Sequence, residues 1–142
     1  FIMSKVAIVY WSGTGNTEQM AQQVQAGAES AGAEAVLLSS AEFSADKMDE
    51  FAAVAFGCPS MGTEQLEESE FDPMFQDCRA KLAGKKIGLF GSYGWGDGQW
   101  MRDWEEMCKE DGAVLAAEPV ICQDAPDDAA AEDCQALGKA LA

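Results

Sequence analysis

The segment KVAIVYWSGTGNT, residues 5–17, decides the fold class. Its first six residues, from Lys5 to Tyr10, form an apolar run without polar alternation, which is typical of a strand buried on both faces of a sheet. A glycine-rich turn follows, and residues 16–31 have the composition of a helix that stops before Gly32. A buried strand that leads through such a turn into a helix indicates the first unit of an α/β fold.

The same alternation of strands and helices continues to the C-terminus. Further strands are predicted at residues 35–38, 53–57, 86–90 and 113–121, the last one broken near Pro119. Helices are predicted at residues 46–51, 71–82, 99–110 and 127–141. Apolar strands of this kind are covered by helices on both faces, so we expect a parallel sheet in a doubly wound α/β sandwich. One domain is expected over residues 3–142, with Phe1 and Ile2 as an artificial extension before Met3.

Composition excludes several classes of partner. The 142 residues include 25 Asp and Glu against 9 Lys and Arg, which gives a formal net charge of −16. Such a chain repels nucleic acid and anionic membrane surfaces and attracts basic proteins, although acidity that serves only solubility is an alternative. No apolar run approaches the ~20 residues of a membrane span, and residues 1–12 lack the features of a secretory signal. We therefore expect a soluble, cytoplasmic protein.

Histidine is absent, which excludes Ser-His-Asp and Cys-His catalysis and histidine-ligated metals. The five cysteines are an odd number, are spread along the chain and form no C-x-x-C pair, so neither a disulfide framework nor a zinc site is predicted. Without a histidine to activate it, Cys58 is expected to be a small buried side chain, like the other four. The sequence predicts no catalytic residue and no metal ligand.

The loop after the first strand, residues 12–17, has the chemistry of an anion site. Two glycines allow a tight turn, while hydroxyl groups and the N-terminus of the following helix favour a phosphate. A nucleotide-hydrolysing P-loop would need a lysine, and none lies between Lys5 and Lys47. The dinucleotide fingerprint also fails, because Glu18 stands where glycine or alanine is required. An ordinary Ser/Thr helix cap is the alternative interpretation.

Two more loops at the expected ligand edge of the sheet have unusual compositions. Residues 57–64 are GCPSMGTE, and residues 91–100 are GSYGWGDGQW. The second loop combines four glycines with aromatic side chains, which suits a flat aromatic ligand that backbone approaches closely. Trp95 or Met61 alone would more often belong to a core, but their place beside the anion loop favours a ligand wall.

Together the three loops, in this order and spacing, resemble those of the short-chain flavodoxins, most closely those of anaerobic bacteria. The resemblance spans residues 3–142, and the fifth strand lacks the insertion of about twenty residues that marks long-chain relatives. It implies a flavodoxin-like three-layer sandwich with a five-stranded parallel sheet of order 2-1-3-4-5. It also implies a low-potential one-electron carrier, not an enzyme, that shuttles non-covalently bound FMN between semiquinone and hydroquinone. The implied cofactor-binding residues are Ser12, Gly13, Thr14, Gly15, Asn16, Thr17, Pro59, Ser60, Met61, Gly62, Thr63, Glu64, Ser92, Tyr93, Gly94, Trp95 and Gly96.

The resemblance also implies individual roles. Residues 12–17 would hold the 5′-phosphate, Trp95 and Met61 would cover the two faces of the flavin ring, and Glu64 would accept a hydrogen bond from flavin N3–H. The carbonyl between Met61 and Gly62 would turn toward N5 on one-electron reduction, which glycine permits with little strain. Backbone groups of residues 92–94 would meet the pyrimidine edge. Trp11 fits a core position and a cofactor contact equally well.

Five acids in nine residues, Glu64, Glu67, Glu68, Glu70 and Asp72, would disfavour an anionic reduced flavin and could form a docking face for basic redox partners. Three positions depart from relatives: Thr63 replaces a frequent Asp, Pro59 replaces a Ser that touches the phosphate, and Asp124 replaces an Asn, so Asp124 is left outside the predicted site. The partners expected are reductases and electron acceptors that bind a monomer transiently.

Two other functions share this topology. An FMN-dependent NAD(P)H:quinone reductase is usually longer and oligomeric, and it has a nicotinamide and quinone pocket for which this chain has no histidine. A phosphoacceptor signalling domain needs an Asp at the end of the third strand, where this chain has Gly57 and Cys58.

Overall fold

The computed structural model describes residues 4–62 and 64–142. Strand β1 (Lys5–Tyr10) lies in the middle of a parallel sheet, between β2 (Glu34–Ser39) and β3 (Ala53–Gly57). Strand β4 (Lys86–Tyr93) pairs with β3, and both β5 (Val114–Leu115) and β6 (Val120–Gln123) pair with β4. The order β2-β1-β3-β4-β5, with β6 continuing the last position, confirms the predicted topology.

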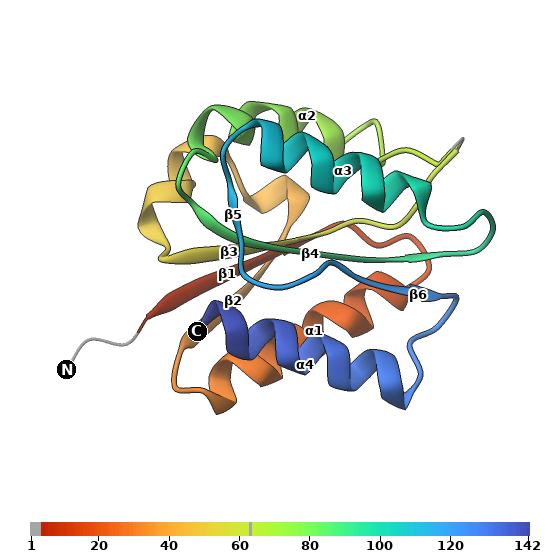
Figure 1. Cartoon of the computed structure of the whole chain (residues 1–142), viewed down its shortest axis with the longest axis horizontal. Coiled ribbons are helices and arrows are strands. Elements are labelled where there is room, and N and C mark those ends of the chain that lie inside the picture. The colour runs from red at the N-terminus through yellow and green to blue at the C-terminus, as the bar shows by residue number, and fades with distance from the viewer. Residues whose placement is uncertain (1–3, 63) are drawn as a thin grey trace.

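Helices cover both faces of this sheet (Figure 1). Helices α1 (Asn16–Ser30) and α4 (Asp128–Leu141) lie on one face, and α2 (Phe71–Cys78) and α3 (Gln99–Glu110) lie on the other. Short 3-10 helices η1 (Ser40–Glu42), η2 (Ala45–Glu50) and η3 (Arg79–Lys81) complete the second face. The three-layer sandwich is therefore confirmed.

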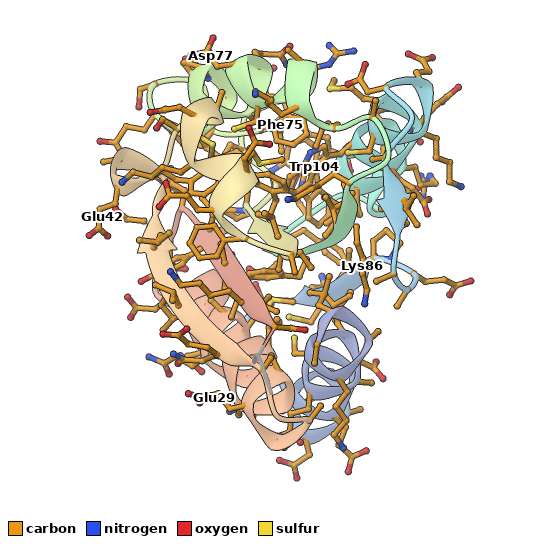
Figure 2. All side chains as sticks on the ribbon, turned by 90° about the vertical axis from the view of Figure 1, so that its left-hand side faces the viewer. Glu29, Glu42, Phe75, Asp77, Lys86 and Trp104 are labelled. Atoms are coloured by element: carbon orange, nitrogen blue, oxygen red, sulfur yellow. The ribbon has the colours of Figure 1, made fainter. Side chains whose placement is uncertain are left out.

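Each face of the sheet has its own apolar core, because successive strand residues point in opposite directions. Ala7 and Val9 of β1 join the core beneath α2 and α3, whereas Val6 and Ile8 join the core beneath α1 and α4. In Figure 2, Phe75 and Trp104 are turned into the interior, and their rings meet edge to face at 5.5 Å. Glu29, Glu42 and Asp77 project outward, away from the core.

Three boundaries differ from the prediction. Helix α2 ends at Cys78, four residues early, and continues as η3. Strand β4 extends to Tyr93, so residues 91–93, predicted as loop, belong to a strand that pairs with β6. The fifth strand is broken near Pro119 as predicted, because proline has no N–H to donate to the ladder, but its second part, β6, ends at Gln123, beyond the predicted end at Ile121.

The five cysteines are free thiols, four of them buried and Cys122 half-buried. Burial raises the pKa of the Cys58 thiol to about 12 and that of Cys122 to about 11, so both stay protonated at neutral pH. Within the parts of the chain that the structure describes, no helix has the length and apolar composition needed to cross a bilayer.

Candidate functional site

Four connecting segments meet at the carboxyl edge of the sheet, where parallel α/β proteins bind ligands. They follow β1, β3, β4 and β6 and surround a cavity of about 240 Å³. The cavity is lined by Trp11, Gly13, Thr14, Asn16, Pro59, Ser60, Met61, Ser92, Tyr93, Gly94 and Asp124. The three loops singled out in the sequence therefore do come together in space.

The loop after β1 presents hydrogen-bond donors at the start of α1. Ser12 Oγ accepts hydrogen bonds from the N–H groups of Gly15 and Glu18, at 3.0 and 3.3 Å. Gly15 occupies the cap position with a φ of 96°, a left-handed conformation that suits glycine, and as a glycine it supplies no side-chain cap. Ser12 takes the N–H of Glu18, and the N–H groups of Asn16 and Thr17 remain open to an acceptor from outside the chain.

Thr17, in the first turn of α1, gives this end of the helix a further donor. Its side chain is 1% exposed, and its hydroxyl Oγ1 has no hydrogen-bond partner among the described residues. Buried hydroxyl groups are normally paired, so an unpaired one points to a missing partner. A hydroxyl, open backbone N–H groups and a helix N-terminus together form a donor set that fits a phosphate.

The loop after β3 forms a closed turn. Met61 and Gln65 exchange two backbone hydrogen bonds, at 2.8 and 2.9 Å, and Gly62 and Glu64 within the turn both have a φ of 54°. The N–H of Ser60 donates to the carbonyl of Ser92 at 3.0 Å, which ties this loop to β4. Thr63, a predicted site residue, lies outside the described residues.

The segment after β4 lies beside this turn. Glu64 Oε1 accepts a hydrogen bond from the N–H of Gln99 at 3.3 Å, and a Cβ at Gly96 would collide with the Glu64 carboxylate. The guanidinium of Arg102 donates to the carbonyl and the carboxylate of Asp97, at 3.1 and 2.9 Å. Trp95, directly before Gly96, is 61% exposed, so its ring is accessible to a ligand.

The predicted site residues divide into two groups. Nine of them line the cavity: Gly13, Thr14, Asn16, Pro59, Ser60, Met61, Ser92, Tyr93 and Gly94. The others lie in the same loops without lining it: Ser12, Gly15, Thr17, Gly62, Glu64, Trp95 and Gly96. The cavity thus takes in the central residues of the first two predicted loops and residues near the start of the third.

Two further residues line the cavity from outside the predicted set. Trp11, equally suited to core and site by sequence, lines the cavity while it packs against the core beneath α2 and α3. Asp124 has a φ of 58°, and its N–H donates to the Tyr93 carbonyl at 2.8 Å, which brings it to the cavity rim. Its position directly after an apolar strand is the signal that could have identified it, because Asp tolerates the left-handed conformation.

The acids near the site differ in their surroundings. Glu64, Glu68, Asp72 and Asp103 line a second groove of about 310 Å³, whose apolar side chains include Trp100, Trp104 and Met107. Glu67 departs from the prediction, which grouped it with acids available to a partner. It is only 6% exposed, because its carboxylate accepts hydrogen bonds from the backbone that starts α2.

The comparison with known proteins identifies the family. The family model described as flavodoxin matches residues 8–138. The chain belongs to the flavodoxin family. It is 45% identical over 135 residues to the flavodoxin of Clostridium beijerinckii, which covers 95% of this chain and 97% of the relative. The flavodoxin of Megasphaera elsdenii is 44% identical over 140 residues, covering 96% and 98%.

Solved structures agree with this assignment. The solution structure of the two-electron reduced flavodoxin of Megasphaera elsdenii superposes with a TM-score of 0.89 at 43% identity, and the match covers 96% of this chain and 97% of that one. Flavodoxins are FMN-binding electron carriers and not enzymes, and the same holds for this member of the family. An electron carrier of this kind has redox proteins as partners.

Proposed function

We propose that this flavodoxin is a low-potential carrier of single electrons that binds FMN at the carboxyl edge of its sheet and passes electrons between basic partner proteins. The observation that carries the proposal is the buried, unpaired hydroxyl of Thr17 beside the open N-terminus of α1. This donor set supports binding of a phosphate without a positive charge in the loop. FMN supplies the redox chemistry when bound, since its ring system accepts electrons one at a time.

Residues 12–17 would hold the phosphate of FMN, with Ser12 keeping the loop in shape through its bonds to Gly15 and Glu18. The remaining contacts would come from the other two loops. Pro59, Ser60 and Met61 line the cavity from one side, and Ser92, Tyr93 and Gly94 line it from the other. The exposed ring of Trp95 is suited to stack on the flavin, and Gly96 leaves room for Glu64 to accept from a ring N–H.

Gly62 supports a change of backbone conformation during electron transfer. Its φ of 54° is accessible to glycine at little cost, and a Cβ at this position would meet nothing closer than 3.7 Å. Rotation of the peptide between Met61 and Gly62 would break the hydrogen bond that its carbonyl accepts from the Gln65 N–H at 2.9 Å, and would leave the bond from the Met61 N–H to the Gln65 carbonyl in place. The rotated peptide would present its carbonyl to a protonated ring nitrogen, which stabilises the one-electron-reduced state selectively.

The surrounding carboxylates support a low potential for the last electron. At ~12 Å and an effective dielectric of ~60, each of them opposes a new negative charge by about 0.5 kcal/mol, or ~20 mV. Four exposed or half-exposed acids near the turn, Glu64, Glu68, Glu70 and Asp72, together with the buried Glu67, would lower the potential by on the order of 100 mV.

Charge also supports the choice of partner. The groove lined by Glu64, Glu68, Asp72 and Asp103 lies against the turn and suits a positively charged protein surface. A net charge of −16 opposes pairing with a second copy, which supports a monomer that docks transiently. The five free thiols suit the reducing conditions of the cytoplasm, where we place this carrier.

Stepwise anaerobic reduction of the purified, FMN-loaded protein, followed by visible spectroscopy, tests this function. We expect the oxidised flavin bands to give way to the long-wavelength absorption of the neutral one-electron-reduced flavin before they bleach. Direct conversion to the two-electron-reduced form, together with turnover of NAD(P)H and a quinone by the isolated protein, would instead establish a reductase. A protein that takes up no FMN would overturn both.

A further inference from the structure

The carboxylate of Glu67 has an unusually complete set of hydrogen-bond donors for an acid next to a loop. Oε1 accepts from the N–H groups of Glu70 and Phe71, at 2.7 and 3.0 Å. Oε2 accepts from the N–H of Ser69 at 3.0 Å and also from the Ser69 hydroxyl. The backbone at the start of α2 therefore folds around one buried carboxylate, which acts as the cap that Glu70, the residue at the cap position, does not supply.

The backbone of Glu67 is also hydrogen-bonded, to residues at both ends of the loop between β3 and α2. Its N–H donates to the Sγ of Cys58 at 3.4 Å, directly after β3, and its carbonyl accepts from the N–H of Asp72 in α2 at 2.8 Å. Cys58 itself is fully buried. Glu67 thus connects the C-terminal end of β3 with the N-terminal end of α2. These contacts hold together the two ends of the segment that contains the turn at residues 61–65.

Burial raises the pKa of the Glu67 carboxyl, but the hydrogen bonds from Ser69, Phe71 and Glu70 outweigh burial and hold this pKa at about 2. The group is therefore charged at neutral pH, and its bonds are of the stronger, charge-assisted kind. Its neighbours Glu68 and Glu70 are exposed and make no comparable set of contacts among the described residues.

We propose that Glu67 is a positioning residue for the turn at residues 61–65. Its carboxylate holds the end of the turn against α2, so the end of the turn keeps its position when the peptide between Met61 and Gly62 rotates. This inference rests on the proposed function of the turn, and it separates Glu67 from the acids that act only through their charge.

The test compares Glu67→Gln with Glu68→Gln. Each variant removes one negative charge from adjacent positions, but only the first replaces an acceptor oxygen by an N–H₂ group that cannot accept from the start of α2. Amide hydrogen exchange of the FMN-free proteins measures the turn directly. We expect exchange at Met61 and Gln65, which bond to each other across the turn, to accelerate roughly ten-fold or more in Glu67→Gln and to stay near wild type in Glu68→Gln. Equal exchange in the two variants would overturn the proposal.

A second measurement uses the FMN-loaded proteins. Both variants remove a charge, so both should favour the fully reduced flavin to a similar extent. Glu67→Gln should in addition lower the share of one-electron-reduced flavin at half reduction, roughly three-fold beyond Glu68→Gln. Identical shares would contradict the positioning role. If Glu67→Gln does not fold, Ser69→Ala, which removes one donor from an exposed position, should show the same changes in weaker form. The exchange test needs no FMN, so it still decides the role of Glu67 if the proposed function fails.

Discussion

At the scale of single residues, the polar atoms that lack partners are the most informative ones. Three buried side-chain atoms have no hydrogen-bond partner in the described part of the chain: Thr17 Oγ1, Ser40 Oγ and Trp104 Nε1. Neither Thr17 nor Ser40 lines the cavity, but Thr17 lies at the N-terminus of α1 next to Asn16, which does line it. The two hydroxyls are matched in chemistry and burial but differ in what they can reach.

Replacing Thr17 by valine keeps the shape of the side chain and removes the hydroxyl. In the FMN-free protein, Thr17→Val should be as stable as wild type or slightly more so, because an unpaired buried hydroxyl is lost. FMN affinity should fall roughly ten- to a hundred-fold, as expected for one hydrogen bond to a charged group. Thermal unfolding and fluorescence titration with FMN measure the two effects, and Ser40→Ala, the control, should leave the affinity unchanged. A destabilised Thr17→Val protein with normal affinity would refute this role.

Residue-level prediction from sequence was partial, for physical reasons. Hydroxyls and glycines in residues 12–17 pointed to an anion site, but nothing in the sequence shows that Thr17 is buried while its neighbours are not. Glu67 was grouped with the other acids because the sequence shows charge and not the backbone around it. Asp124 is left outside the predicted site because it replaces an Asn of relatives, and the sequence does not show its place at the cavity, which depends on the pairing of β6 with β4, a contact between distant segments.

At the scale of elements, the position of the C-terminal end of β4 relative to β3 determines the shape of the cavity. Gly91 lies where a Cβ would collide with the carbonyl oxygen of Cys58, the same oxygen that accepts the indole N–H of Trp100 at 3.2 Å. The strands and helices themselves were predictable, because uninterrupted apolar runs alternate with helical segments. Their ends were less predictable, because the extension of β4 to Tyr93 needs β6 as a partner.

Gly91→Ala should push β4 away from the end of β3. We expect a loss of about 1–3 kcal/mol in the free energy of unfolding of the FMN-free protein, measured in urea. Gly94→Ala is the matched control, since its Cβ would meet only Asp124 Oδ1, at an ordinary 3.8 Å. Equal stability of the two variants would mean that the strands adjust without cost.

The start of α2 should make stability depend on pH through Glu67. Its folded-state pKa, about 2, lies below the ordinary value of 4.5, so the ionised carboxylate stabilises the folded state above pH 4.5. This contribution is lost as the pH falls from about 4.5 through about 2. Cys58, which faces Glu67, stays neutral throughout. The difference in unfolding free energy between wild type and Glu67→Gln should be largest at neutral pH and should vanish toward pH 2, whereas a difference that does not change with pH would exclude this linkage.

At the scale of the whole molecule, an acidic protein has to bind an anionic cofactor. The net charge of −16 repels the phosphate of FMN at long range, while the donors at the start of α1, the proposed phosphate site, would attract it only on contact. The charge balance was fully predictable from composition. The repulsion between this charge and FMN can be inferred only once the proposed anion site has been located in the fold.

The association rate of FMN with the FMN-free protein should therefore rise with salt, roughly ten-fold between low and high ionic strength, because screening weakens the repulsion. Stopped-flow quenching of flavin fluorescence measures this rate. Riboflavin, which has the same ring system but no phosphate, is the control and should show little dependence on salt. A rate for FMN that falls with salt would indicate a local positive field that outweighs the net charge.

The division of the last strand into β5 and β6 also affects how copies of this protein meet. One edge of the sheet is interrupted near Pro119, which cannot donate to a neighbouring strand, so a second chain has no continuous template there. The opposite edge, β2, is an unbroken strand of six residues. Aggregation of a partly unfolded population should therefore begin by strand addition at β2, far from the broken edge. A proline or lysine introduced in β2 should reduce this aggregation and so protect stored protein.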